Sequence, residues 1–312
     1  MRRRALALLL LCTLAALLAA GCGVGGGDET PQEVRLRVTE AFGTEPVTNR
    51  RIDSIPRGDT VLRLLQREMS VRTRFGGGFV QAIDGRTGGR DEGRPLDWFF
   101  YVNGIESSTG AGEVRLNRGD RVWWDLHDWG ATMRVPAVVG SFPEPFLSGS
   151  KGKRIPARVE CAKGAERECD EVTERLENAG VTKMSRSVVS QTDEGGVLRI
   201  LVGRWTDLRL DPTAFRIARG PEQSGVYARI DASGRRLDVL DQRGRTVRTL
   251  GAGTGLVAAT RKEDNAPVWV VTGTDAVGLA AAAAAVDESV LSGRFAVAIE
   301  DGQAVALPAV TP

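Results

Sequence analysis

The sequence predicts an α+β fold, and three observations support this. In the first 130 residues, short runs rich in aromatic and β-branched residues alternate with Gly-containing turns, as strands and hairpins do. A single helical pattern interrupts these runs, with Val61, Leu62, Leu65 and Met69 on one face. In the second part, strand-like and helix-like runs alternate. With 312 residues, the chain is long enough for one large domain or two smaller ones.

The N-terminus has the pattern of a secretory leader. Three arginines precede an apolar run from Ala5 to Ala20. The sequence Leu-Ala-Ala-Gly-Cys at 18–22 resembles the lipobox of bacterial lipoproteins. This resemblance implies a signal peptide at 1–21, lipidation of Cys22, a Gly-rich tether at 22–32 and an extracytoplasmic protein anchored to the cell membrane. The alternatives are an uncleaved membrane anchor and plain secretion, but the run is short for a membrane span.

Charge bears on the partner, and cysteine content agrees with that location. Without the three leader arginines, 39 basic side chains face 40 acidic ones, and so balanced a charge argues against a nucleic acid partner. Cys161 and Cys169 are the only cysteines after Cys22. Outside the cytoplasm we expect them to form a disulfide that ties the end of a strand to the following helix. A metal site would need more ligands.

The first elements have clear local signals. Residues 34–39 alternate apolar and basic side chains, which predicts a half-buried strand. Asp59 or Thr60 is expected to cap the helix that starts beside Val61. A glycine run at 76–78, a short strand at 79–83 and a polar loop at 84–95 follow.

The stretch 97–129 holds four of the six tryptophans and the only histidine. Its runs at 98–102 and 122–126 predict strands that are bounded by Asn103-Gly104 and Gly119-Asp120 turns.

These elements together resemble a known family. The family is the bacterial domain family named for the C-terminal domain of transcobalamin. Its helix-starting turn resembles Gly58-Asp59-Thr60-Val61-Leu62, and its W-x-x-Y-V-N-G strand resembles the run Trp98 to Gly104. Its l-x-x-GD-x-V turn resembles the run Leu116 to Val122. The resemblance covers residues 33–130. It implies a β-grasp-like fold, and it implies a corrinoid or another planar molecule as the ligand. The chain lacks the helical domain that supplies the cobalt-coordinating histidine in the animal carriers.

A segment rich in proline and glycine follows at 131–153. Pro143 and Pro145 exclude a helix and disfavour a central strand, so we expect an extended linker or edge segment. Docking to a partner is the alternative.

The second domain, at 154–312, contains a repeated order of elements. Each unit has the order strand, Thr-Asp cap, helix, Ser-Gly turn and strand. The first unit has its strands at 200–202 and 226–230, with a Thr206-Asp207 cap and a helix-like stretch between them. The second unit has its strands at 268–271 and 295–299, with Thr274-Asp275 and a helix at 276–286 between them. This order predicts β-α-β units in an α/β or α+β domain. A helix at 166–179 precedes them, and a hairpin is expected within 237–259. Residues 155–231 also distantly resemble sporulation-related repeat domains, which bind peptidoglycan glycans.

Catalytic chemistry has little support in the sequence. A lone histidine, His127, removes Ser/His/Asp and Cys/His arrangements and any multi-histidine metal site. The glycine runs at 76–78 and 251–255 lack the Gly-Lys-Ser/Thr ending of a phosphate loop. The acidic pairs Asp125/Asp128 and Asp91/Glu92 are expected to be solvated surface carboxylates.

The remaining candidate is the aromatic group formed by Tyr101, Trp123, His127 and Trp129. Strand alternation places Trp123 and His127 on one face and Trp124 and Leu126 on the other, toward the helix. The first face suits a planar ring, a sugar or a protein partner. The alternative is that residues 131–146 fold back and cover this face.

These observations predict a binding protein without enzymatic activity and without a resident cofactor or metal. The first hypothesis is capture of a corrinoid or other planar ligand as an accessory to an uptake system. The alternative is an envelope adaptor whose C-terminal domain holds peptidoglycan or a protein partner.

Overall fold

The computed structural model describes residues 33–190 and 195–310. The leader, the lipidation site at Cys22 and the tether lie outside the described residues. Strands dominate the rest, with few helices, and the α+β class is confirmed. None of the helices in the described ranges has the length and apolar character needed to cross a membrane.

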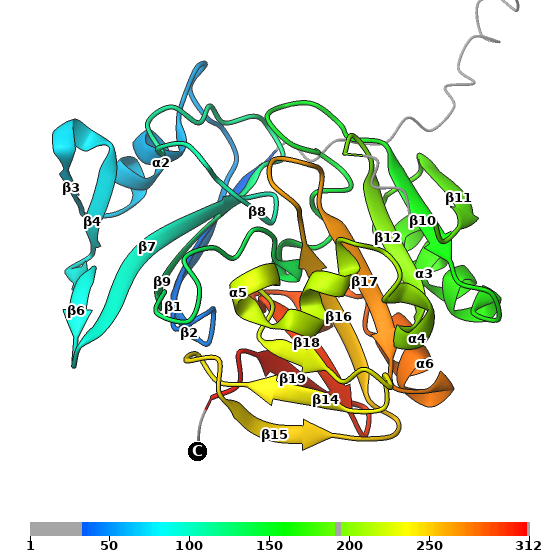
Figure 1. Cartoon of the computed structure of the whole chain (residues 1–312). Helices are drawn as coiled ribbons and strands as arrows, with labels where there is room; N and C mark the ends of the chain where they lie inside the picture. The colour runs from blue at the N-terminus through cyan, green and yellow to red at the C-terminus, as the bar shows by residue number, and fades with distance from the viewer. Residues whose placement is uncertain (1–32, 191–194, 311–312) are drawn as a thin grey trace, which may run out of the picture.

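The N-terminal half is a mixed sheet with one helix on one face. The strand order is β2-β1-β9-β7-β6, with β8 paired to β7, and β1 and β9 run parallel. The strands of this sheet are β1 (Val34–Glu40), β2 (Glu45–Ile52), β6 (Gly89–Asp91), β7 (Arg94–Val102), β8 (Ile105–Glu106) and β9 (Arg121–Asp128). A small second sheet projects from it at the left of Figure 1; it contains β3 (Val71–Arg74), η1 (Phe75–Gly77) at its tip, β4 (Phe79–Ile83) and β5 (Arg86–Thr87).

Helix α2 (Val61–Glu68) forms as its sequence predicts. The Thr60 hydroxyl accepts a hydrogen bond from the Arg63 amide at 3.3 Å, which caps the first turn. Val61 and Leu65 pack in one cluster with Trp124 and Leu126 of β9. The predicted assignment of Trp124 and Leu126 to the helix side of the sheet is therefore confirmed.

The C-terminal half is built on a seven-stranded sheet of order β11-β10-β12-β17-β16-β18-β19. Its elements are β10 (Ala157–Cys161), α3 (Glu166–Asn178), β11 (Met184–Val188), β12 (Leu198–Arg204), β16 (Gly255–Thr260), β17 (Val268–Gly273), α6 (Ala276–Ala284), α7 (Glu288–Leu291), β18 (Ala296–Glu300) and β19 (Gln303–Leu307). Cys161 at the end of β10 and Cys169 in α3 form the predicted disulfide, with their Cα atoms 5.9 Å apart.

The predicted repeat is right for the second unit and wrong for the first. In the second unit, Asp275 caps α6 by accepting from the Gly278 amide at 2.9 Å, and β18 returns to the sheet that contains β17. In the first unit, β13 lies in a different sheet from β12. Pro212 and Pro221 interrupt the intervening segment, so no helix is long enough to carry the chain back beside β12. The pieces that replace it are α4 (Trp205–Leu208), η3 (Ala214–Arg219) and α5 (Pro221–Ser224), followed by the antiparallel strands β13 (Ala228–Ile230), β14 (Leu237–Leu240) and β15 (Thr246–Leu250).

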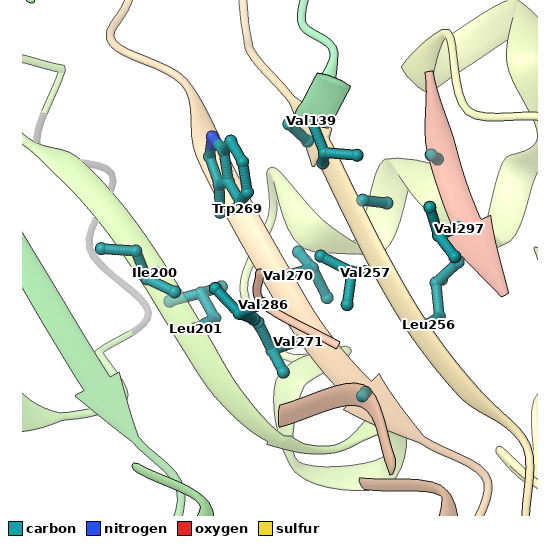
Figure 2. Close-up of a cluster of buried hydrophobic side chains, with 14 of the residues drawn as sticks. Val139, Ile200, Leu201, Leu256, Val257, Trp269, Val270, Val271, Val286 and Val297 are labelled. Carbon is teal, nitrogen blue, oxygen red and sulfur yellow. The ribbon is translucent and has the colours of Figure 1, made fainter. Parts of the chain in front are cut away.

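The segment 131–153 is not an exposed tether. Residues 135 and 137–149 are buried, and η2 (Val139–Ser141) joins the core of the C-terminal half. Figure 2 shows Val139 close to the side chains of β16 and β17, in the cluster that includes Trp269 and Val257. The same cluster takes in Phe42, Tyr101 and Trp123 from the N-terminal half. The two halves therefore share one core through this segment.

Candidate functional site

The predicted aromatic face assembles from β7 and β9. Tyr101 pairs directly with Trp123 in the antiparallel ladder, and Asp97 pairs with His127. The rings of Tyr101 and Trp123 lie 6.0 Å apart. Strand alternation therefore brings Tyr101, Trp123 and His127 to one face. Trp129 lies apart from them, half-buried, with its indole nitrogen donating to Asp97 at 2.9 Å.

A buried polar network fixes this face. Asp125 accepts hydrogen bonds from the Thr39 hydroxyl at 2.5 Å and from the amides of Phe42 at 3.0 Å and Gly43 at 2.8 Å, and its Oδ1 lies 2.8 Å from His127 Nδ1. The Trp123 indole donates to Thr39 at 2.7 Å. The Thr39 hydroxyl is bonded to Asp125 and not to His127, so the Asp-His pair does not orient this hydroxyl. The network positions aromatic rings.

Two acidic residues of this strand differ from the prediction. Asp125 and Asp128 are buried and not solvated. Asp125 accepts the hydrogen bonds described above, and Asp128 accepts one from the Gly130 amide at 2.8 Å. Buried carboxylates persist where such donors replace water. The second pair, Asp91 and Glu92, is exposed as expected.

The aromatic face is closed by the rest of the protein. Phe295, which precedes β18, stands edge-on to Trp123 at 5.0 Å, to Tyr101 at 5.5 Å and to His127 at 5.6 Å. The His127 ring is stacked between Phe42 at 4.3 Å and Phe99 at 4.5 Å. We call this group of rings the aromatic seam; its members are Phe42, Phe99, Tyr101, Trp123, His127 and Phe295.

The segment 137–142 also covers the seam, beside Phe295. A Cβ atom on Gly140 would lie 2.6 Å from the backbone of Arg294 and 2.8 Å from Trp123, so only glycine allows this approach. The predicted ligand face is therefore buried in this structure. The structure agrees with the alternative, in which the segment after Trp129 covers this face. Phe295 contributes to the cover as well.

Charged residues reinforce the seam at its edge. Glu288 pairs with Arg35 at 3.1 Å and with Arg121 at 2.7 Å, which links α7 to β1 and β9. Arg37 donates to Ser292 at 2.7 Å, and its guanidinium lies 5.6 Å from the centre of the Trp123 ring. Burial lowers the pKa of Arg37. The two halves are thus joined by apolar, aromatic and ionic contacts.

A cavity remains open between the halves, away from the seam. We call it the interdomain cavity; its volume is about 390 Å³. This lies within the ~300–1,000 Å³ that small-molecule sites occupy. The N-terminal half contributes β8, the loop that follows it and the approach to β9; the C-terminal half contributes 195–196 and 261–267, and the segment 150–155 completes the wall.

The cavity combines apolar walls with charged groups. Val102, Ile105 and Ile155 are among the apolar lining residues. Glu106 lies in the wall, buried, and accepts from Arg134 Nε at 3.0 Å. Burial raises the pKa of Glu106, while Arg134 opposes that rise. Arg261 also lines the cavity and donates from Nη2 to the Glu106 carbonyl at 3.2 Å. Such a mixture can hold and orient a small molecule.

Sequence reasoning missed Glu106 and Arg261. Neither residue belongs to a recognisable motif, and 155 positions separate them. The one local signal is the turn Asn103-Gly104, which places β8 and hence Glu106 at a sheet end. Among residues 33–190 and 195–310, no group of three or more His, Cys, Asp or Glu side chains is placed to hold a metal ion.

Comparison with known proteins gives a family match within the N-terminal half and partial likenesses to solved structures. Residues 58–128, which run from just before α2 to the end of β9, match a family described as a domain of unknown function (DUF4430). No curated protein matches the chain. A solved structure from Ruminococcus gnavus, provisionally described as a metal-binding protein, has 17% identity and a TM-score of 0.26, and the match covers 31% of this chain and 97% of that one. Haptocorrin in complex with Cbi has 14% identity and a TM-score of 0.24, with 35% of this chain and 28% of that chain covered. The chain is thus similar to a domain family without an assigned function.

Proposed function

We propose that this protein is an extracytoplasmic, lipid-anchored binding protein that holds a small molecule in the interdomain cavity without changing it chemically. The observation that carries the proposal is the cavity itself, an apolar-walled space of about 390 Å³ between two halves that are otherwise tightly joined. Its walls come from both halves, which is a common position for ligand sites.

The proposed location rests on the leader and lipobox of the sequence, and the Cys161–Cys169 disulfide supports it because such bonds persist in oxidising compartments. A non-catalytic role agrees with the aromatic seam. The lone histidine is packed between Phe42 and Phe99 and bonded to Asp125, so it is not placed to exchange protons with a bound molecule.

The experiment is a comparison of two tryptophan variants. Ala266 lines the cavity, so Ala266→Trp is expected to fill it. Ala232→Trp places the same side chain at an exposed position outside the cavity. Melting temperatures of the mature protein and both variants would be measured against a library of small metabolites. Ligands that stabilise the native protein and Ala232→Trp, but not Ala266→Trp, would support the proposal. If no compound discriminated the variants in this way, the proposal would fail.

Corrinoid capture at the aromatic face stays a prediction. Because Phe295 and Gly140 cover that face, corrinoid binding there requires the seam to open. An absorbance titration with cobinamide on the native protein and on Phe295→Ala tests this. Cobinamide binding by the variant alone would indicate that the aromatic face can bind a corrinoid once Phe295 is removed. The absence of a spectral change in both proteins would contradict corrinoid capture.

A further inference from the structure

Arg261 directly follows β16 and is one of the least satisfied charged groups in the described part of the chain. Its side chain is 8% exposed. A guanidinium has five N–H donors. The Nη2 group donates to the Glu106 carbonyl at 3.2 Å, while Nε is buried and has no hydrogen-bond partner among the described residues. Leaving a buried charged donor without a partner is costly, so such groups in native proteins call for an explanation.

The carboxylates near Arg261 do not neutralise it well. Asp264 lies 3.6 Å from Nη2, but its side chain is 86% exposed, so water screens this pair. Glu106 is engaged by Arg134. Asp120, the third acidic residue of the cavity wall, accepts from Asn103 at 2.9 Å and from the Asn117 amide at 2.8 Å. Burial lowers the pKa of Arg261, which agrees with an incompletely compensated charge.

The surroundings of Arg261 favour an anion with an apolar body. The side chain lines the interdomain cavity and also a second hollow of about 580 Å³. The cavity wall offers Val102, Ile105 and Ile155 to an apolar group. Exposed cations stand at the same cavity; they are Arg115, Lys151 and Lys153. Exposed cations raise the local concentration of anions and speed their entry.

We propose that the interdomain cavity binds an organic anion that carries one carboxylate and a small apolar body, and that the guanidinium of Arg261 receives the carboxylate. The planar guanidinium matches a carboxylate in geometry, and charge-assisted hydrogen bonds of this kind are about twice as strong as neutral ones. The proposal names the ligand class of the function proposed above and rests on it.

The direct test is nuclear magnetic resonance of the native protein with ¹⁵N-labelled arginine. Benzoate and benzamide have similar shapes and differ in charge. Benzoate is expected to shift the Nε–H signal of Arg261, which is identified by its absence in Arg261→Gln, and benzamide is expected to leave it in place. An Arg261 signal that benzoate leaves unchanged up to its solubility limit would overturn the proposal, and this readout does not depend on any variant binding the probe.

Calorimetry with variants gives the second readout. Arg261→Gln is expected to weaken benzoate binding at least about tenfold, and Arg115→Gln, at the exposed rim, less than about threefold. Arg261→Lys keeps a charge but lacks the planar guanidinium, so its loss of benzoate affinity should lie between the losses of these two variants. Equal affinities for benzoate and benzamide would overturn the anion assignment. If neutral library compounds then still bound in a way that Ala266→Trp blocks, the function proposed above would stand and only the ligand class would be wrong.

Discussion

Replacing Phe295 by alanine tests the most consequential contact between the two halves. The ring is 3% exposed and meets the rings of Phe42, Tyr101, Trp123 and His127 at 5.0 to 5.6 Å. Truncating a buried Phe to Ala costs ~3–5 kcal/mol, because apolar burial is lost and a cavity is left. That range already includes the loss of edge-on aromatic pairs, each of which contributes ~0.5–1.5 kcal/mol beyond the buried area. We therefore expect Phe295→Ala to lower the free energy of unfolding by about 4 kcal/mol.

Urea unfolding followed by tryptophan fluorescence measures this loss, because Trp123 lies against Phe295 and reports on the seam. Phe75→Ala is the matched control: that ring is 86% exposed at the tip of the β3–β4 sheet, and its removal should change the free energy of unfolding by no more than ~0.5 kcal/mol. A loss for Phe295→Ala below ~1.5 kcal/mol would show that the seam does not join the two halves.

Three further changes are expected to have measurable effects. Gly140→Ala should lower the free energy of urea unfolding by ~1–3 kcal/mol, since the new Cβ would lie 2.6 Å from the Arg294 backbone. Gly251 has open space around it, so Gly251→Ala should not lower that free energy. Equal losses in the two variants would contradict close packing at Gly140. Reducing the Cys161–Cys169 disulfide should lower the free energy of unfolding by ~2–3 kcal/mol, and unchanged urea midpoints with and without reductant would speak against this. Burial raises the pKa of Glu144 in the folded protein above its ordinary 4.5, so the folded state holds the carboxyl proton more tightly than the unfolded state does. The contribution of Glu144 to the free energy of unfolding therefore falls as the pH rises from about 4.5 through the raised pKa. Glu144→Gln should therefore lose less stability relative to the native protein at pH 7.5 than at pH 4.5; the opposite order in paired unfolding curves would reverse the sign of the argument.

Local patterns were sufficient to predict the helix side of the N-terminal sheet. The cap at Thr60 and the apolar spacing of Val61 and Leu65 define α2, and strand alternation assigns Trp124 to its side. The disulfide followed from compartment and cysteine number alone. These features depend on neighbours within a few residues or on a single pair.

Features that depend on distant partners could not be predicted in the same way. Alternation placed Trp123 and His127 on one face, but no local pattern names the side chain that covers it. Phe295 lies in a Ser-Gly-Arg-Phe turn that looks like an ordinary approach to a strand. The interdomain cavity poses the same problem, since Glu106 and Arg261 meet only after both halves have packed. The prediction of the first repeat unit failed for a local reason that the sequence does contain: Pro212 and Pro221 break the stretch between β12 and β13.

The closing of the aromatic seam by Phe295 also sets an order of events during synthesis. Once His127 has been made, about 170 further residues must be added before Phe295 exists, which takes roughly 10 to 30 s at ~5–20 residues per second. Throughout that interval Tyr101, Trp123 and His127 lack the ring of Phe295. The aromatic face of a growing chain therefore lacks this part of its cover for more than half of the time that synthesis takes, until the last strands are made.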